Sequence, residues 1–276
     1  MKIAALEPLV INVSEKTNWF FIRVTAENGL TGLGEASLNG WESAQLAVAE
    51  NMRAALQGKA IEDAPPLLQV YPHSPGGLIA SSIASATEQA ITDLRAKLAG
   101  VPVHALLGRQ AARKRVQVYA NINRGARDRS PDGIAQAARN AVAAGYGAVK
   151  IAPFDGAYPG HPDAAELKRL TQSGIDRIYA IREAVGPDIN VMVDCHWRFN
   201  ESGALQLIRD LQAAQLYWLE CPASENPDGF AALRRIHDET ARSGMKLAGA
   251  ERQVAGAGFK PFVEGGLLDV VMPDIK

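Results

Sequence analysis

Three short apolar runs in the second half of the chain each end on a carboxylate, at Asp194, Glu220 and Glu251. If the fold brings these ends together, the three negative charges raise one another's pKa values, and a divalent cation removes that penalty. Ligands that are all oxygen, with positions left for water and substrate, suit Mg²⁺ better than Zn²⁺. The sequence therefore predicts that Asp194, Glu220 and Glu251 bind Mg²⁺, with Mn²⁺ as an alternative.

Each carboxylate has a simpler explanation when it is considered alone. It could cap the helix that follows, or it could lie solvated in a loop, because Asp and Glu are common at protein surfaces. Three such residues in succession, each directly after an apolar run, make shared metal binding the better explanation.

Two further runs end on Lys150 and Asp274, and a histidine, His196, follows Asp194 by two residues. Side chains alternate between the two faces of a strand, so residues two positions apart share a face. This parity places His196 beside the metal, although a lone histidine is as often structural as catalytic. It also places Lys276 on the side of Asp274.

Parallel strands are needed to bring these residues together. Short apolar runs at 116–122, 148–151, 190–195, 216–220, 246–250 and 268–272 alternate with helical patterns at 130–144, 174–185, 201–214 and 230–243. Repeated βα units imply parallel strands, and apolar runs fit burial on both faces. The series lacks a Gly-x-Gly-x-x-Gly motif after its first strand, which favours a (β/α) TIM-like barrel over a dinucleotide-binding sheet. In such a barrel the carboxyl ends of the strands form the active site.

The first 112 residues follow a different pattern. Strands are expected at 3–13, 19–25 and 31–35, and helices at 42–56 and 79–99, the second ended by Gly100-Val101-Pro102. We therefore predict an α/β protein with a small α+β domain at 1–112 and a barrel domain at 113–276. A closed barrel needs eight strands and this sequence provides six, so we expect an incomplete barrel from a longer, truncated protein rather than an open sheet with unpaired edges.

The composition indicates which kinds of binding partner and which cellular compartment to expect. The net charge of −1 gives no reason to expect nucleic acid or an anionic membrane as a partner. Neither a signal peptide nor a membrane-spanning apolar run is recognisable. With only two cysteines, Cys195 and Cys221, a disulfide framework is not expected, and a reduced cytoplasmic setting fits. Both cysteines should point outward into the helix layer, and we assign them no chemistry.

The chain resembles the mandelate racemase branch of the enolase superfamily over its whole length. The segments that carry the resemblance are 21–25 with 29–36, 93–103 with 106–108, Val193-Asp194, Leu219-Glu220-Cys221-Pro222, Ala250-Glu251 and 271–274. Each motif is weak alone, but together they occur in the family's order and at barrel spacing. The resemblance implies that the first domain is a capping domain, that the substrate is a small-molecule carboxylate bound to Mg²⁺, and that the protein forms a homo-oligomer.

In the family's chemistry, the metal and a lysine stabilise the enediolate formed when the proton next to the carboxylate is removed. Lys150 matches the first lysine of the family's Lys-x-Lys motif, but Ala152 stands where the second would be. Alanine cannot accept a proton, so two-base racemisation is disfavoured. Asp274 matches the aspartate that pairs with a seventh-strand histidine to form the other base.

His196 falls in an Asp-x-His pattern that resembles the branch's acid-sugar dehydratases, in which the histidine protonates a leaving hydroxyl group. Such general acid catalysis contributes typically ~10²–10⁴-fold. The resemblance thus implies a lyase that dehydrates a sugar acid to a 2-keto-3-deoxy acid. Two alternatives stay open: a racemase or epimerase of a hydroxy or amino acid with another base, such as Lys276, and an inactive truncated fragment that only binds metal.

Substrate-binding residues are expected at the rim of the barrel and in the capping domain. Loops 12–19 and 37–41 could cover the barrel mouth, which makes Trp19 and Asn39 candidates, although Trp19 could equally be a packing residue. Arg124, after the first barrel strand, could contact a polyol or a second carboxylate, although loop arginines are most often solvated. Lys276 is the last candidate for substrate binding.

Overall fold

The computed structural model describes residues 1–15, 17–64, 67, 77–108, 115–123 and 125–275. The chain divides into two compact units, Met1–Arg115 with Val254–Gly258 and Asp274–Lys276, and Val116–Gln253 with Phe259–Pro273. The predicted boundary between residues 112 and 113 lies outside the described residues. None of the described helices is both long and apolar enough to cross a membrane.

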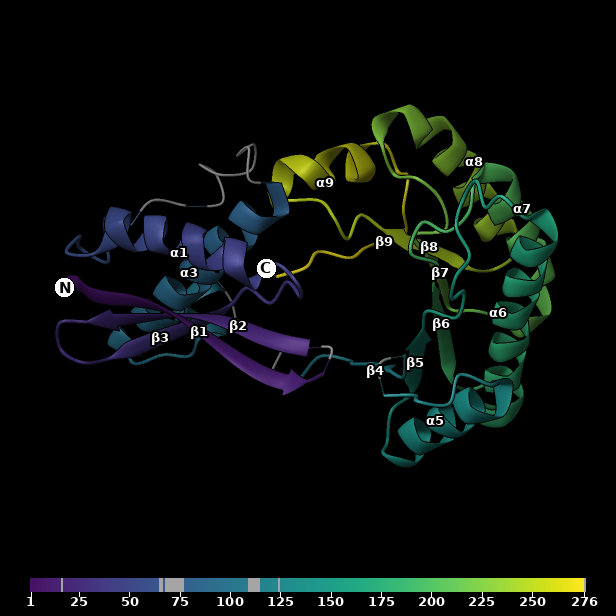
Figure 1. The fold of residues 1–276 in the computed structure, drawn as a ribbon, viewed down its shortest axis with the longest axis horizontal. Helices are drawn as coiled ribbons and strands as arrows, with labels where there is room; N and C mark the ends of the chain where they lie inside the picture. The colour runs from purple at the N-terminus through teal and green to yellow at the C-terminus, as the bar shows by residue number, and fades with distance from the viewer. Residues whose placement is uncertain (16, 65–66, 68–76, 109–114, 124, 276) are drawn as a thin grey trace. The chain divides into compact units, whose positions relative to one another are not determined.

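The first unit contains an antiparallel sheet of β1 (Ile3–Ser14), β2 (Thr17–Ala26) and β3 (Thr31–Glu35), in that order. Its helices are α1 (Glu42–Leu56), α3 (Gly77–Leu98) and α4 (Val103–Leu107) (Figure 1). Phe20, Ile22 and Val24 alternate along β2 and are fully buried. A Cβ atom at Gly32 would lie 1.9 Å from the carbonyl oxygen of Ala90 on α3, so glycine allows β3 to approach this helix. The predicted α+β organisation is confirmed.

The second unit contains a parallel sheet whose strand order follows the chain. Its strands are β4 (Ala120–Asn121), β5 (Ala148–Ile151), β6 (Asn190–Asp194), β7 (Trp218–Glu220), β8 (Lys246–Gly249) and β9 (Val270–Val271). The helices are α5 (Pro131–Ala143), α6 (Ala164–Val185), α7 (Glu201–Asp210) and α8 (Phe230–Arg242), with short 3₁₀ turns η1 (Gln212–Ala214) and η2 (Pro227–Gly229). Helix α9 (Ala255–Glu264) is divided, with its first residues grouped in the first unit and the rest, from Phe259, in the second. Helices α5 to α8 lie along one face of the sheet (Figure 1). This is the arrangement of an incomplete (β/α) barrel, as predicted.

Several predicted boundaries were wrong for physical reasons. The strand expected at 116–122 is reduced to β4, and Val116 and Val118 are exposed. Helix α6 begins ten positions earlier than predicted, and Gly174 lies inside it rather than at its start. A Cβ atom there would lie 2.3 Å from the ring of Phe154, so this glycine serves helix packing and does not begin the helix. The pattern at 201–214 splits into α7 and η1, and α9, with Pro261 inside it, was not predicted.

The two faces of the parallel sheet have different cores. Val193, Leu219 and Leu247 belong to the large cluster that packs against the helices. Met192 and Trp218, on the alternate positions, form a small cluster on the opposite face, together with Ala248. Cys195 lies in the helix-facing cluster, and Cys221 is buried too, with both thiols free, so the predicted outward direction of Cys195 is confirmed.

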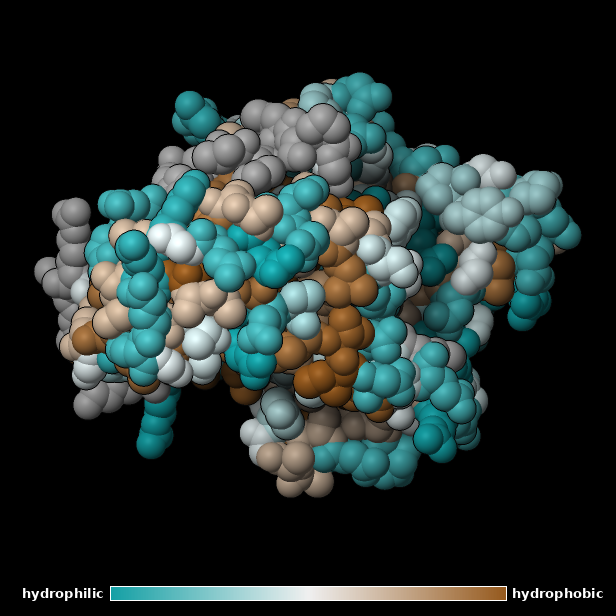
Figure 2. Space-filling model, turned by 60° about the vertical axis from the view of Figure 1, so that its left-hand side comes forward, coloured by the Kyte–Doolittle hydropathy of each residue, from teal (hydrophilic) through white to brown (hydrophobic). Residues whose placement is uncertain are grey.

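Hydrophobic residues also reach the surface between hydrophilic ones (Figure 2). Trp19 and Trp41 are 47% and 55% exposed, so neither belongs to the buried core of the first unit. Trp19 packs edge-to-face against Phe21, with ring centroids 6.2 Å apart, so the packing alternative stays open and its predicted contact with substrate is untested.

Candidate active site

The carboxyl ends of β5, β6 and β7 bring three buried charged groups together. Asp194 and Glu220 end their strands and are direct neighbours in the register of the sheet. Lys150 lies on β5, opposite Met192 of β6. Only 8% of Lys150, 6% of Asp194 and 1% of Glu220 is exposed, so water compensates little of their charge.

Lys150 is held mainly by Glu220. Its Nζ atom donates to both carboxylate oxygens of Glu220, at 2.9 and 2.8 Å, and lies 3.8 Å from Oδ2 of Asp194. It also lies 5.4 Å from the centre of the Tyr119 ring. Burial alone would lower the pKa of Lys150, but the charge and hydrogen bonds of Glu220 outweigh it and raise the pKa. Lys150 is therefore a fixed positive charge at neutral pH rather than a proton acceptor.

The carboxylates outnumber the positive charge available to them. Burial, and then the charge of Asp194, raises the pKa of Glu220 even though Lys150 acts in the opposite direction. The charge of Glu251, two residues beyond β8, raises it further. The cluster thus favours an added cation, and oxygen donors of this kind fit Mg²⁺ or Mn²⁺.

Glu220, Glu251 and Cys221 place one possible ligand atom each within 4.8 Å of one another. Burial raises the pKa of the Cys221 thiol far above its usual range, so this residue keeps its proton and is a poor ligand for a hard cation. Glu220 and Glu251 are therefore the carboxylates that the structure brings to ligating distance. Asp194 borders this pair but is outside the 4.8 Å group.

Asp194 instead contacts His196. Its Oδ2 atom lies 2.9 Å from Nε2 of His196, and its Oδ1 accepts a hydrogen bond of 3.0 Å from the His196 backbone N–H. The Asp194 hydrogen bond raises the pKa of His196, against the effect of burial, so more imidazolium is present near neutral pH than in a free histidine. His196 lies beside Asp194 as predicted, but not through strand parity, because β6 ends at Asp194 and His196 has a φ of 49°.

The backbone at these strand ends is strained. His196, Trp197, Cys221 and Ala250 have φ values of 49°, 56°, 45° and 67°, although none is glycine. Such conformations cost of the order of 1–3 kcal/mol each and concentrate at functional sites. Cys221 and Ala250 are adjacent to Glu220 and Glu251, and His196 and Trp197 lie two and three residues beyond Asp194.

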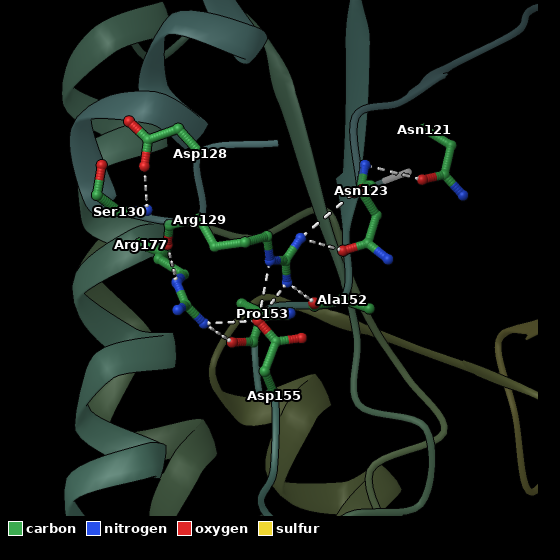
Figure 3. A network of polar contacts seen from close by, with 9 residues as sticks. All are labelled: Asn121, Asn123, Asp128, Arg129, Ser130, Ala152, Pro153, Asp155 and Arg177. Atoms are coloured by element: carbon green, nitrogen blue, oxygen red, sulfur yellow. Dashed lines mark hydrogen bonds and ion pairs between the residues drawn. The ribbon is translucent and has the colours of Figure 1, made fainter. Parts of the chain in front are cut away.

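The ends of β4 and β5 carry a different network, seen in Figure 3. Arg129 binds Asp155 with an N–O distance of 2.7 Å, and donates to the carbonyl oxygen of Ala152 at 2.8 Å and to Oδ1 of Asn123 at 2.6 Å. Arg177 of α6 lies 3.1 Å from the same Asp155 carboxylate and donates to the carbonyl oxygen of Arg129 at 2.6 Å. The network therefore fixes the loop that follows Lys150.

Sequence reasoning missed Arg129 and Arg177 and named Arg124 instead, which lies outside the described residues. The position of Arg129, next to the N-cap Ser130 of α5, was the available signal, because the amino ends of the helices lie near the carboxyl ends of the strands. It also missed Glu225, which is 7% exposed and five residues beyond Glu220.

The remaining predicted site residues are grouped with the first unit or lie outside the described residues. Asn39 accepts a hydrogen bond of 3.0 Å from the backbone of Asn18 within the first unit, where Trp19 also lies. Asp274 is grouped with the first unit too, and Lys276 lies outside the described residues. Their roles toward substrate therefore stay predictions.

Comparison with known proteins identifies the family. Residues 133–276 match a family model described as enolase C-terminal domain-like, and residues 3–108 match the mandelate racemase/muconate lactonizing enzyme N-terminal domain. The chain belongs to the mandelate racemase/muconate lactonizing enzyme family of the enolase superfamily. A family member from Roseovarius sp. TM1035, named as a mandelate racemase/muconate lactonizing enzyme-like protein, has a structure with a TM-score of 0.83 at 25% identity, covering 100% of this chain and 72% of that one.

Relatives with assigned activities are dehydratases. A D-gluconate dehydratase from Thermoproteus tenax is 31% identical over 191 residues, which are 69% of this chain and 36% of the relative. A D-mannonate dehydratase from Caulobacter sp. strain K31 is 30% identical over 256 residues, 83% of this chain and 62% of the relative. The chain thus spans less than two thirds of the length of these curated relatives.

Proposed function

We propose that this protein is a magnesium-dependent lyase that dehydrates a sugar acid to a 2-keto-3-deoxy acid. The observation that carries the proposal is the excess of carboxylates at the ends of β6, β7 and β8 over the single buried ammonium of Lys150. The dehydratase relatives favour this reaction over others of the superfamily. Ala152, at the position of a second lysine base, gives two-base racemisation less support.

Asp194, Glu220 and Glu251 are the residues that would hold Mg²⁺, or Mn²⁺ in its place. The donor chemistry fits, because hard cations prefer carboxylate oxygens and the raised pKa of Glu220 shows that its own surroundings leave its charge undercompensated. When bound, the cation would supply positive charge to the substrate carboxylate and make the neighbouring C–H bond more acidic.

Two residues of the cluster act on the substrate in this proposal. The Lys150 ammonium stabilises the negative charge that develops on the substrate carboxylate when its α-proton leaves. His196 donates its proton to the β-hydroxyl, so the C–O bond breaks with loss of water, and the enol product converts to the 2-keto acid. The family resemblance assigns proton removal to Asp274 together with a histidine from a seventh strand.

A panel of sugar acids tests the proposal in the full-length protein, with Mg²⁺ or with EDTA, and with an assay for 2-keto acids. We expect product from at least one acid, and none in EDTA. Exchange of the α-proton of a hydroxy or amino acid without dehydration would instead indicate a racemase or epimerase. Mg²⁺ binding with no turnover of any carboxylate would favour the non-enzymatic alternative.

The proposed partners are a small-molecule carboxylate and further copies of the chain. Light scattering on the purified protein tests the homo-oligomer, since a monomeric mass would contradict it.

A further inference from the structure

Glu225, in the loop that follows β7, is a buried carboxylate outside the candidate metal cluster. Its Oε1 atom accepts a hydrogen bond of 3.0 Å from the backbone N–H of Ala250. Hydrogen bonds with the side chains of Trp197 and Cys221 complete its surroundings. None of the ion pairs among the described residues includes Glu225, so these three contacts are what compensates its burial.

The three contacts of Glu225 belong to three different strand ends. Trp197 follows His196 at the end of β6, Cys221 follows Glu220 at the end of β7, and Ala250 precedes Glu251 after β8. One carboxylate therefore connects the backbone segments from which all the candidate ligands project.

The same three residues are among the strained ones. Trp197, Cys221 and Ala250 have φ values of 56°, 45° and 67°. A non-glycine residue keeps such an unfavourable conformation only where its surroundings over-determine it. The backbone N–H of Ala250 and the side chains of Trp197 and Cys221 all donate to this one carboxylate, which is a means of holding the three residues.

The space around Glu225 is also specific. A Cβ atom at Gly249 would lie 2.0 Å from Oε1 of Glu225, so a larger residue in β8 would displace the carboxylate. Glu225 also lines an open cavity of about 490 Å³, together with Trp197, Glu201 and Arg252. Glu201 differs in that its carboxylate pairs with Arg235, through a 2.8 Å contact to Oε2.

We propose that Glu225 is a positioning residue that holds the strained ends of β6, β7 and β8 and thereby sets the separation of the Glu220 and Glu251 carboxylates for a divalent cation. It touches neither cation nor substrate and acts through the backbone. The inference rests on the proposed function in one respect, that these carboxylates bind a cation.

The test measures Mn²⁺ affinity by calorimetry in the full-length protein without substrate. Loss of a residue that orients metal ligands typically weakens metal binding ~10–100-fold, and we expect this for Glu225→Ala. Glu225→Gln keeps an oxygen acceptor for the Ala250 N–H and should recover most of the affinity. Glu201→Gln removes a carboxylate from the same cavity without touching the strand ends, and should bind Mn²⁺ like the parent.

Gly249→Ala provides a second route, because it displaces the Glu225 carboxylate and leaves its charge in place. We expect it to weaken Mn²⁺ binding as Glu225→Ala does, and it decides the question if Glu225→Ala fails to fold. Parent-like Mn²⁺ affinity in folded Glu225→Ala or Gly249→Ala would overturn the positioning role while leaving the proposed function intact. A parent protein that binds no Mn²⁺ would instead overturn the proposed function, and the positioning role with it.

Discussion

Two parts of the same sheet edge balance their charged side chains in opposite ways. After β4 and β5, the single carboxylate of Asp155 is shared by Arg129 and Arg177, whose other donors bind backbone carbonyls (Figure 3). After β6, β7 and β8, three carboxylates share one ammonium, Lys150, and one histidine. In the first region the arginines and the carboxylate balance one another. In the second region the negative charge exceeds the positive charge of the protein's own side chains, so a bound cation would stabilise it.

The backbone shows the same contrast. Non-glycine residues with positive φ occur at 196, 197, 221 and 250, and also at 215 and 255 away from these strand ends, but at no described position from 115 to 155. Strain and uncompensated charge thus coincide at the ends of β6 to β8. This coincidence separates a candidate active site from a structural rim more clearly than the presence of charged residues, which both regions have.

The largest difference between the two regions is expected when one carboxylate is removed from each and turnover is compared. We expect Glu220→Gln to abolish metal-dependent turnover, a loss of at least about 10²–10³-fold, because the cation loses a ligand. Its unfolding temperature in EDTA should fall as well, because the buried Lys150 ammonium loses its main partner. Asp155→Asn should lower the unfolding temperature and change turnover by only a few fold. Similar losses of turnover in both variants would abolish the distinction between the regions.

The next largest effect concerns His196 alone. His196→Asn should slow dehydration by about 10²–10⁴-fold, because the proton donor for the leaving hydroxyl is lost. Asparagine tolerates the left-handed backbone at this position, so the strand end should persist. Mn²⁺ affinity and exchange of the substrate α-proton with solvent deuterium should stay close to those of the parent. If deuterium exchange is lost as well, His196 is the base and not the acid.

Much of this contrast was visible in the sequence. Uninterrupted apolar runs fix β5 to β8, and the polar residue that ends each run marks Lys150, Asp194 and Glu220 as neighbours. These features are local in the sequence. Because neighbouring parallel strands end at the same edge of the sheet, the residues at their ends lie close together. The side of the sheet that Cys195 occupies followed from the same alternation.

The rest depends on contacts between segments that are distant in the chain. Gly174 looks like the start of a helix until the ring of Phe154 is seen to occupy the space of its side chain. Arg129 meets Asp155 across 26 positions, and Glu225 meets Ala250 across 25. The strained φ of Cys221 likewise has no local sequence signal, because nothing in cysteine favours that conformation.

Breaking the rim network should cost stability and leave the chemistry largely intact. Arg129→Met removes the bonds to Asp155, Asn123 and Ala152, and we expect the free energy of unfolding to fall by about 1–3 kcal/mol. The control is Arg169→Met on α6. The Arg169 side chain is 67% exposed, against 26% for Arg129, so its loss should cost less than about 1 kcal/mol. Urea titration measures both. Equal costs would mean that the rim is an ordinary surface ion pair and that its contrast with β6 to β8 is overstated.

The smallest expected effect is on the pH dependence of stability, and it has opposite signs for two glutamates. Burial raises the pKa of Glu225 above its unfolded value of about 4.3, so the native state binds the proton more tightly than the unfolded chain. Its contribution to stability is therefore full below about pH 4.3 and is lost as pH rises through the native pKa. In EDTA, the unfolding temperature of Glu225→Gln should therefore rise relative to that of the parent as the pH increases from 5 to 8.

Glu166 gives the matched control, because its hydrogen bond with Arg169 lowers its pKa. The stabilisation by the Glu166 carboxylate is present above its unfolded pKa and is lost as pH falls. The unfolding temperature of Glu166→Gln should therefore fall relative to that of the parent as pH rises through the acid range. A Glu225→Gln variant that behaved like Glu166→Gln would show that Glu225 is stabilised as an anion. The ends of β6 to β8 would then be compensated like the Arg129 rim, and the electrostatic reason for expecting a cation there would be weaker.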